Sequence, residues 1–587
     1  MKKENTKEFK RLSFFKELYE NAKSAYAEKC AELDTYMEQY LGSDVIDGSH
    51  ERASTVRNIT YEMIESQVSS DIPPPKVDAA CYSERRDRNA KSIERLLMSV
   101  RDRLSYEEMN DIDERYTYIY GSSVWYVEWD NSEILGNEIG SVKLYCLSPK
   151  SFIPQPCIAS VDDMEYCFLE FTASASEIER KYQVSPEDTS LLDFDIDSSE
   201  GERDNARIVI AFYRDEKGEV GKFVFSGDVI LSDLPSYYKR KRKVCKICHK
   251  EPSSCLCTKK SFIESDVDFE KINLPVSTSD CNFSTAAPVL ENAEIPYYTP
   301  KSFPIVIRKN TSCDERLFGQ SDCKFLRPQQ QAINKVESRI LQKLLRAGIT
   351  PIVPEDATIS LNNTVFGQVI KMKPGESAQQ YGKVDTTPDI SQDIAEAERL
   401  YDQAKRTLGI SDALMGISNS KNESGYARQL QISQATGRLE SKRKMKHTAY
   451  ADLDRIIFEM YLAFADEPRT LSYKDAYGRI HDAKFSRYDF IEFDENRCAY
   501  YYDDAYLFSV DLNGGAEYQR EALWQRNLEN LTSGALGDPK NSITLLRYWQ
   551  AQERAHYPHA RENVEYFMLA VEEEKAKEAN AFGEINY

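Results

Sequence analysis

Apolar residues recur at helical spacing over most of the first 120 residues. Residues 12–41 predict an amphipathic helix, whose apolar positions are Phe15, Leu18, Ala22, Ala25, Leu33, Tyr36 and Tyr40. A second helix is predicted near 57–70, ending at the breaker Ile72-Pro73-Pro74-Pro75. Two more are predicted across 86–120, and they stop at Gly121.

The period changes after Gly121. Ser122–Trp129 and Ser141–Leu147 alternate between apolar and polar positions around Gly136, Asn137 and Gly140, which predicts a β-hairpin. Strand-like runs recur at 164–172, 207–213 and 220–231. Residues 185–205 carry eight acidic side chains against the single Arg203, and this composition favours a solvated or disordered loop.

Helical spacing returns in the middle of the chain. Pro328 suits the first turn of a helix that Gly348 and Pro351 end, with an apolar side of Ile333, Val336, Ile340, Leu344 and Leu345. About 40 residues of short strands and turns are predicted next. Another helix starts near Ser391 and stops at Gly409. The polar stretch 411–424 predicts a loop, and Ser424 can cap a helix that runs from 425 to about 465.

Length and composition limit the class of protein. A chain of 587 residues ordinarily divides into about 3 to 5 domains. The start, MKKENTKEFKRLSFF, lacks the apolar core of a signal peptide, and no later run approaches the roughly 18 apolar residues of a membrane span. We therefore expect no membrane association and synthesis into the cytoplasm.

The net charge of −21 argues against a protein that grips DNA, because that role requires a basic surface. It is compatible with a protein through which DNA slides. Catalysis finds little support: the run from Gly218 to Lys222 lacks the spacing of a phosphate-binding loop, and no H-E-x-x-H motif occurs. Paired acids such as Asp503-Asp504 are ordinary in so acidic a chain. The sequence predicts that the protein is not an enzyme.

Four of the thirteen cysteines cluster within thirteen residues, in the pattern Cys245-x2-Cys248-x6-Cys255-x-Cys257. Zinc prefers four soft ligands in a tetrahedron, and a Cys-x2-Cys turn directs two sulfurs to one centre. The Cys-x-Cys half is tighter than usual, and His249 could replace one thiol. The pattern predicts a structural zinc site, with free or redox-active thiols as the alternative.

Two basic clusters have more than one interpretation. Lys239-Arg240-Lys241-Arg242-Lys243 could bind nucleic acid, bind an acidic partner such as another subunit's 185–205 loop, or be solvated. In the long helix the second cluster could form ion pairs between subunits, form a solvated face or, third, contact DNA. Its members are Arg438, Lys442, Arg443, Lys444, Lys446 and His447.

The order of elements resembles the phage portal protein family over nearly the whole chain. The segment Asn58–Val68 followed by prolines is similar to the family's N-terminal helix, and GSSVWYVEWD from Gly121, Ser148-Pro149 and Phe152-Ile153-Pro154 are similar to its wing strands. The remaining similarities lie around the predicted helical hairpin, at Phe318-Gly319-Gln320-Ser321-Asp322, Gln330, Asn334, Ser338, Gly409-Ile410-Ser411-Asp412 and Ser424-Gly425-Tyr426-Ala427.

The resemblance implies an α+β portal fold with seven parts. They are an N-terminal arm and mixed α/β wing (1–318), a first stem helix (319–348), a small β-containing clip (349–388), a second stem helix (389–410), a tunnel loop (411–424), a long wing helix with wing strands (425–510) and an α-helical crown with the C-terminal tail (511–587). The stretch at about 237–260 departs from the family pattern as an insertion in the wing.

The resemblance also implies a ring, usually of twelve subunits, at one capsid vertex of a tailed phage, assembled in the host cytoplasm. Double-stranded DNA would pass through its channel. The implied partners are the terminase large subunit, a head-completion or adaptor protein, and the major capsid and scaffolding proteins. In the tunnel loop Ser418, Asn419, Lys421 and Asn422 would lie nearest DNA, although Lys421 could equally be a surface lysine without a role.

Two other functional classes fit the sequence less well than a portal protein. A zinc-knuckle regulatory or processing protein that binds nucleic acid should have a larger basic domain than these short stretches. A head–tail adaptor would be far shorter than this chain. A helical hairpin packed inside an ordinary monomer is the structural alternative to a stem.

Overall fold

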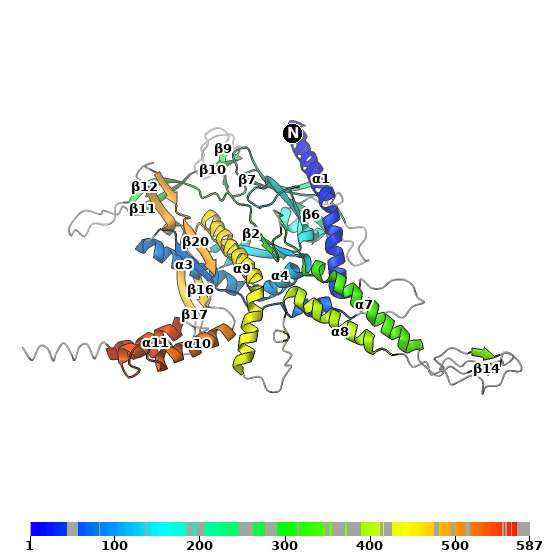
Figure 1. Cartoon of the computed structure of the whole chain (residues 1–587). Coiled ribbons are helices and arrows are strands. Elements are labelled where there is room, and N and C mark those ends of the chain that lie inside the picture. The colour runs from blue at the N-terminus through cyan, green and yellow to red at the C-terminus, as the bar shows by residue number, and fades with distance from the viewer. Residues whose placement is uncertain are drawn as a thin grey trace, which may run out of the picture.

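The structure is a computed structural model of the chain (Figure 1). It describes residues 2–43, 57–81, 83–135, 138–184, 192–194, 205–245, 262–267, 269–275, 290–313, 316–346, 352–354, 370–372, 389–410, 412, 415, 425–474, 480–494, 499–510, 517–554, 557, 560, 562–564 and 566–571. Helices and antiparallel sheets together form an α+β fold, which confirms the predicted fold class. None of the helices within these ranges combines the length and apolar character that crossing a membrane requires.

A three-stranded antiparallel sheet lies at the centre of the molecule. Its strands are β2 (Ser122–Leu135), β3 (Glu138–Leu147) and β13 (Ile305–Lys309), in the order β13-β2-β3. The predicted hairpin is thus confirmed, with Val124 opposite Leu147 and Trp129 opposite Val142. Two helices precede it, α3 (Glu84–Arg103) and α4 (Tyr106–Tyr120), and α4 ends at Gly121 as predicted.

A five-stranded antiparallel sheet lies beside the first. Its order is β4 (Phe152–Pro154), β5 (Tyr166–Ser174), β6 (Asn205–Arg214), β7 (Val220–Ser226) and β8 (Val229–Leu234), with α5 (Ala175–Tyr182) after β5. The predicted strand run 220–231 is therefore two strands. Helix α1 (Lys2–Leu41) covers one face of this sheet, where its Leu12, Phe15 and Tyr19 pack on the sheet's apolar side chains.

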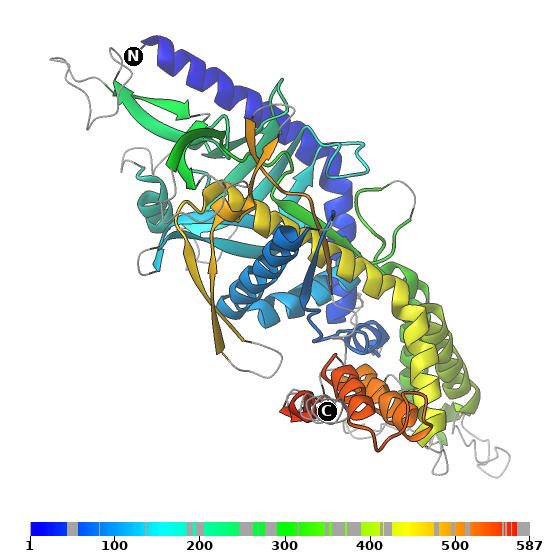
Figure 2. The same cartoon turned by 90° about the vertical axis from the view of Figure 1, so that its left-hand side faces the viewer.

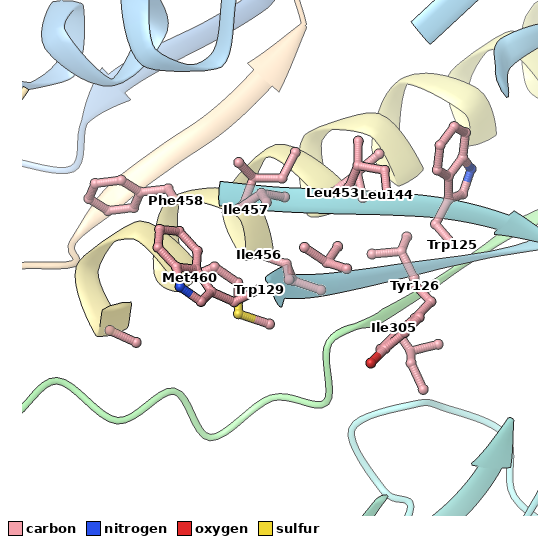
Figure 3. Packing of buried hydrophobic residues seen from close by; sticks show 14 of the residues in the cluster. Trp125, Tyr126, Trp129, Leu144, Ile305, Leu453, Ile456, Ile457, Phe458 and Met460 are labelled. Carbon is pink, nitrogen blue, oxygen red and sulfur yellow. The ribbon is translucent and has the colours of Figure 1, made fainter. Parts of the chain in front are cut away.

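A helix as long as α1 crosses the central sheet. Helix α9 (Gly425–Phe464) has the predicted bounds within one residue. Figure 3 shows its Leu453, Ile456 and Ile457 against strands that carry Trp125 and Trp129. These side chains belong to the largest core of the molecule, so the second half of α9 is fixed to the sheet by apolar burial.

Two helices project from this body side by side toward β14 (Figures 1 and 2). They are α7 (Asp322–Arg346) and α8 (Ser391–Leu408), and between them β14 (Ile352–Pro354) pairs in parallel with β15 (Ile370–Met372). The bounds predicted for α8 are correct at both ends, and Gly409 takes the left-handed conformation that ends the helix.

Two predicted helix boundaries are wrong. Pro328 lies in the second turn of α7, because the helix already begins at Asp322, where the Ser321 hydroxyl accepts a hydrogen bond from the N–H of Cys323. Helix α2 (Ile59–Glu65) is shorter than the predicted 57–70. It ends early because the side chains of Ser66 and Gln67 both donate to the carbonyl of Met63.

The remaining strands form two-stranded antiparallel ribbons. The pairs are β1 (Pro75–Ala79) with β20 (Tyr506–Val510), β9 (Arg240–Cys245) with β10 (Phe262–Val267), β11 (Phe269–Pro275) with β12 (Leu290–Pro296), β16 (Arg469–Lys474) with β17 (Ile480–Phe485), and β18 (Ile491–Asp494) with β19 (Ala499–Tyr502). Helices α10 (Glu517–Thr532) and α11 (Ser542–Arg554) lie at the opposite end of the molecule from β14 (Figure 1).

The backbone after α4 touches the backbone before α7 at two glycines. Gly121 has φ +87°, and a Cβ there would lie 2.6 Å from the carbonyl oxygen of Gly319. A Cβ at Gly319 would meet the carbonyl oxygen of Gly121 at the same distance. Only glycine permits this close approach of the two backbones, which explains why both positions are occupied by glycine.

Gly121→Ala should lower the free energy of unfolding by about 3 kcal/mol. Alanine is strained at this left-handed φ, and its Cβ would also clash with the carbonyl oxygen of Gly319. Gly218→Ala is the matched control: Gly218 has φ +78° but open space around it, so the loss there should be about 1 kcal/mol. Urea unfolding of both variants measures the difference. Equal losses would show that the contact with Gly319 does not constrain the fold.

Candidate functional site

The helical hairpin α7/α8 is held together by an apolar seam. Buried side chains from both helices meet those of α2 in one cluster, formed by Ile59, Met63, Leu326, Ile333, Leu400, Tyr401, Ala404 and Ile410. Of the apolar positions predicted for the first of these helices, Ile333 and Val336 lie in this cluster, whereas Leu344 is exposed. The seam accounts for the buried side of the hairpin and leaves the opposite sides to solvent or to other chains.

Ion pairs reinforce the two ends of the hairpin. Near its projecting end the carboxylate of Asp393, in the first turn of α8, pairs with Arg339 at 2.6 Å and with Lys343 of α7. At the base the Arg57 guanidinium lies 4.7 Å from the centre of the Tyr401 ring, and the Tyr401 hydroxyl donates to Glu62 at 2.5 Å. The hairpin is therefore tied to α2 as well as to itself.

A buried carboxylate at the start of α7 binds the long helix α9. Asp322 is fully buried, and its carboxylate accepts from Lys442 Nζ at 2.6 Å. The same carboxylate accepts from the side-chain amides of Gln67 at 3.0 Å and Asn310 at 2.8 Å. One side chain thus joins four segments: the end of α2, the residue after β13, the first turn of α7 and α9.

A second buried group lies one turn further along α9. Lys446 Nζ pairs with Glu114 of α4 at 2.9 Å and donates to the carbonyl of Asp71 at 2.7 Å. Glu114 also pairs with Arg308 of β13 at 2.8 Å, and Arg308 makes a further ion pair with Asp113. We call Asp113, Glu114, Arg308, Asp322, Lys442 and Lys446 the charged joint.

The charges of the joint stabilise one another. Burial alone raises the pKa of a carboxyl group, but Arg308 and Lys446 hold the pKa of Glu114 below its usual value. Burial lowers the pKa of Lys446, although the carboxylate of Glu114 opposes this shift. The stability that Glu114 contributes is therefore present above its unfolded pKa and is lost as the pH falls through its folded pKa.

The joint corrects the interpretation of the basic cluster in α9. Lys442 and Lys446 pair inside their own subunit, so for these two both an intersubunit belt and a solvated face are wrong. Lys444 is exposed and lies 3.7 Å from Glu440, in accord with a solvated position. The side chain of Arg438 lies outside the described residues.

The free surface of the hairpin is mixed. Three large apolar side chains are exposed on it: Phe325 by 41%, Leu344 by 49% and Ile394 by 46%. Basic Lys335 and Arg339 lie on the exposed side of α7, and Glu398 and Asp402 on that of α8. Exposed apolar groups of this size, on helices that already pack together, suit contact with another protein surface.

Most of the predicted site residues fall outside the described residues. These are the tunnel-loop residues Ser418, Asn419, Lys421 and Asn422, and the cysteines Cys248, Cys255 and Cys257. Cys245 ends β9, where its backbone pairs with Phe262 of β10. In the part of the chain that the structure describes, no three His, Cys, Asp or Glu residues are placed to hold a metal ion.

Sequence reasoning missed the acidic half of the joint. Asp113 and Glu114 sit in an ordinary polar helix, and their partners lie far away in the chain. Arg308 carried a usable signal, because it directly follows the apolar run Ile305-Val306-Ile307 within the same strand. A charged residue in a buried strand needs a buried counter-charge.

One comparison with known proteins identifies a family. A family model described as Phage P22-like portal protein matches residues 158–476, which is more than half of the chain. The matched region contains the hairpin, α9 and the basic half of the charged joint. The search of curated proteins found no match.

Lys442→Met should lower the free energy of unfolding by about 3–5 kcal/mol, because it leaves the buried Asp322 carboxylate without its cation. Combining it with Asp322→Asn should restore part of this loss, since the uncompensated charge is then gone. Lys444→Met is the control, because its side chain is 71% exposed, and it should change stability by less than about 0.5 kcal/mol. Urea unfolding measures all three variants. A Lys442 variant as stable as the Lys444 variant would contradict the role of the joint.

Proposed function

The chain belongs to the family of P22-like phage portal proteins, and from this premise we propose that it forms a ring through which double-stranded DNA enters and leaves the capsid. The family match carries this conclusion. A portal protein is a structural component of the phage capsid rather than an enzyme. Passage of DNA, the number of subunits and the partners that dock are the finer parts of the proposal.

We assign α7 and α8 to the stem that surrounds the channel. At about 1.5 Å per residue, helices of 25 and 18 residues span roughly 37 and 27 Å, a suitable depth for a channel wall. The segment 349–388, which includes β14 and β15, would be the clip that docks the terminase large subunit and then a head-completion protein. The end that carries α10 and α11 would face the capsid interior, and the remainder would form the wing toward capsid and scaffolding proteins.

Ring closure requires two different surfaces on each subunit that fit each other. The exposed Phe325, Leu344 and Ile394 support a stem-to-stem contact as one part of this interface. Twelve subunits is the number that the family resemblance implies. The buried ion pairs of the joint would then act inside each subunit, while the apolar stem surface acts between subunits.

The purified chain should assemble into closed rings of about twelve subunits, a number taken from the resemblance and compatible with closed symmetry. Phe325→Glu with Ile394→Glu should shift the mass toward single subunits, because charges in an apolar interface are costly. Phe9→Glu, exposed by 72% on α1, is the control and should leave the ring intact. Mass photometry separates these outcomes. A wild-type chain that remains monomeric at high concentration, with or without scaffolding protein, would contradict the proposal.

We further propose that the segment 411–424 lies near the narrowest part of the channel. A repulsive acidic wall would keep DNA centred, and a sparse cation such as Lys421 could touch phosphates without creating a site that holds them. The position of this segment between α8 and α9 supports the proposal, because both helices belong to the part of the chain matched by the family model.

Deleting residues 413–423 should permit ring assembly but impair packaging or retention of DNA, because the contact with phosphates at the constriction is lost. A DNA-packaging assay with infectious particles, scored alongside ring assembly, measures both effects. Lys421→Ala alone should weaken retention less than the deletion. Normal packaging and retention by the deletion variant would rule out this role.

We also propose that Cys245, Cys248, Cys255 and Cys257 bind structural zinc. Strands β9 and β10 pair in register, from Arg240 opposite Val267 to Cys245 opposite Phe262. The connection between them carries the other three cysteines, and it therefore starts and ends at adjacent residues, which supports the proposal. Basic residues of β9 stand opposite acids of β10, Lys243 opposite Glu264 and Lys241 opposite Asp266. Because the strand register sets basic positions opposite acidic ones, it weighs against a nucleic-acid-binding zinc protein as the second candidate function.

Purified protein should contain about one zinc ion per chain, and Cys245→Ser with Cys248→Ser should abolish it, because a four-ligand site cannot lose two thiolates. Elemental analysis of protein prepared without chelators gives the stoichiometry. Cys313→Ser, at an exposed cysteine outside the cluster, is the control and should leave zinc unchanged. Absence of stoichiometric metal in the wild-type chain would refute the site.

A further inference from the structure

A cavity of about 180 Å³ lies beside α5, and none of the residues that line it belongs to the hairpin or the charged joint. Aromatic rings from four elements line it: Tyr126 of β2, Tyr145 of β3, Phe171 of β5 and Tyr182 of α5. Tyr126, Tyr145 and Phe171 pack within 5.8–6.0 Å of one another, centre to centre. Such ring faces attract positive charge because their π-electron density is negative.

One carboxylate of the cavity lining is buried. Glu128 is 8% exposed, and its Oε1 accepts from Lys222 Nζ at 2.9 Å. Lys222 Nζ also donates to the Tyr126 hydroxyl at 3.1 Å and lies 5.2 Å from the centre of the Tyr237 ring. The chain therefore already holds one ammonium group between this carboxylate and aromatic rings.

The other oxygen of Glu128 has a weaker partner. Lys181 Nζ lies 3.5 Å from Oε2, a long contact, and its side chain is 50% exposed. The same ammonium lies 5.7 Å from the centre of the Tyr182 ring. Glu128 thus serves two ammonium groups: the inner one is buried and closely bound, whereas the outer one is half exposed and loosely bound.

Two carboxylates of the cavity act on its tyrosines. Burial raises the pKa of Tyr145 and Tyr182, and the charge of Glu128 raises both further. Glu177, which also lines the cavity, acts in the same direction on both rings. A cation entering beside these rings would meet the carboxylates of Glu128 and Glu177 among the aromatic side chains that line the cavity.

We propose that this cavity binds a primary alkylammonium group, which takes the place of the Lys181 ammonium on Glu128 Oε2 while its alkyl part lies among Tyr145, Phe171 and Tyr182. The ligand is a free amine or the lysine side chain of another protein, since both present the same group. The inference rests on the cavity alone, and only the experiment that separates the two sources of the ligand depends on the proposed ring.

The test uses n-propylammonium as the probe and n-propanol, which has the same alkyl chain without charge, as its control. Ligand-observed NMR should show saturable binding of the ammonium and none of the alcohol. Lys181→Met removes the internal competitor, so it should tighten binding about tenfold. Lys217→Met, at an exposed lysine outside the cavity, should leave binding unchanged. Tyr145→Leu should weaken binding, whereas Tyr145→Phe, which keeps the ring, should not.

Comparing rings with separated subunits identifies the source of the natural ligand. Uptake of the probe by both supports a free amine, whereas uptake by separated subunits alone supports a lysine of a neighbouring chain. The proposal is overturned if neither the wild-type nor the Lys181→Met chain binds the probe, or if n-propanol binds equally well. Because tighter binding is the expected result, a misfolded variant cannot imitate it.

Discussion

The arrangement of this molecule depends on the requirement that buried charges be paired. Lys442 and Lys446 enter the interior from α9, and each meets a carboxylate that would be costly to leave alone, Asp322 or Glu114. Because these acids belong to α7 and α4, the long helix cannot slide along either helix without separating a charge pair. Apolar packing holds the second half of α9 on the central sheet, and the two lysines fix its position along the sheet.

The hairpin takes its direction from this joint. Asp322 lies in the first turn of α7, three residues after the backbone contact of Gly319 with Gly121, so the helix starts at a point fixed by sterics and by charge. The seam with α2 and the pairs of Asp393 then keep α8 beside it. A projecting hairpin with a rigid base suits the proposed channel wall, since loosely held copies could not form an opening of constant width.

Local signals in the sequence predicted the elements well and the joint poorly. The end of helix α8 is predictable because Gly409 terminates it. The start of α7 is not, because the cap at Ser321 begins the helix before Pro328. Gln67 was assigned to α2, although it turns away to reach Asp322. Lys442 and Lys446 fit the pattern of a surface cluster, because nothing near them in the chain shows which distant acid will lie opposite. Periodicity reports burial, but a pair between distant elements is defined only by the fold.

Electron cryomicroscopy of the assembled protein, at a resolution that shows side chains, tests both the ring and the charged joint directly. We expect a closed ring in which α7 and α8 surround the central opening and Lys442 of each subunit contacts Asp322 of the same subunit. A ring with the hairpin on its outer rim, or with Lys442 paired to a neighbouring chain, would contradict it.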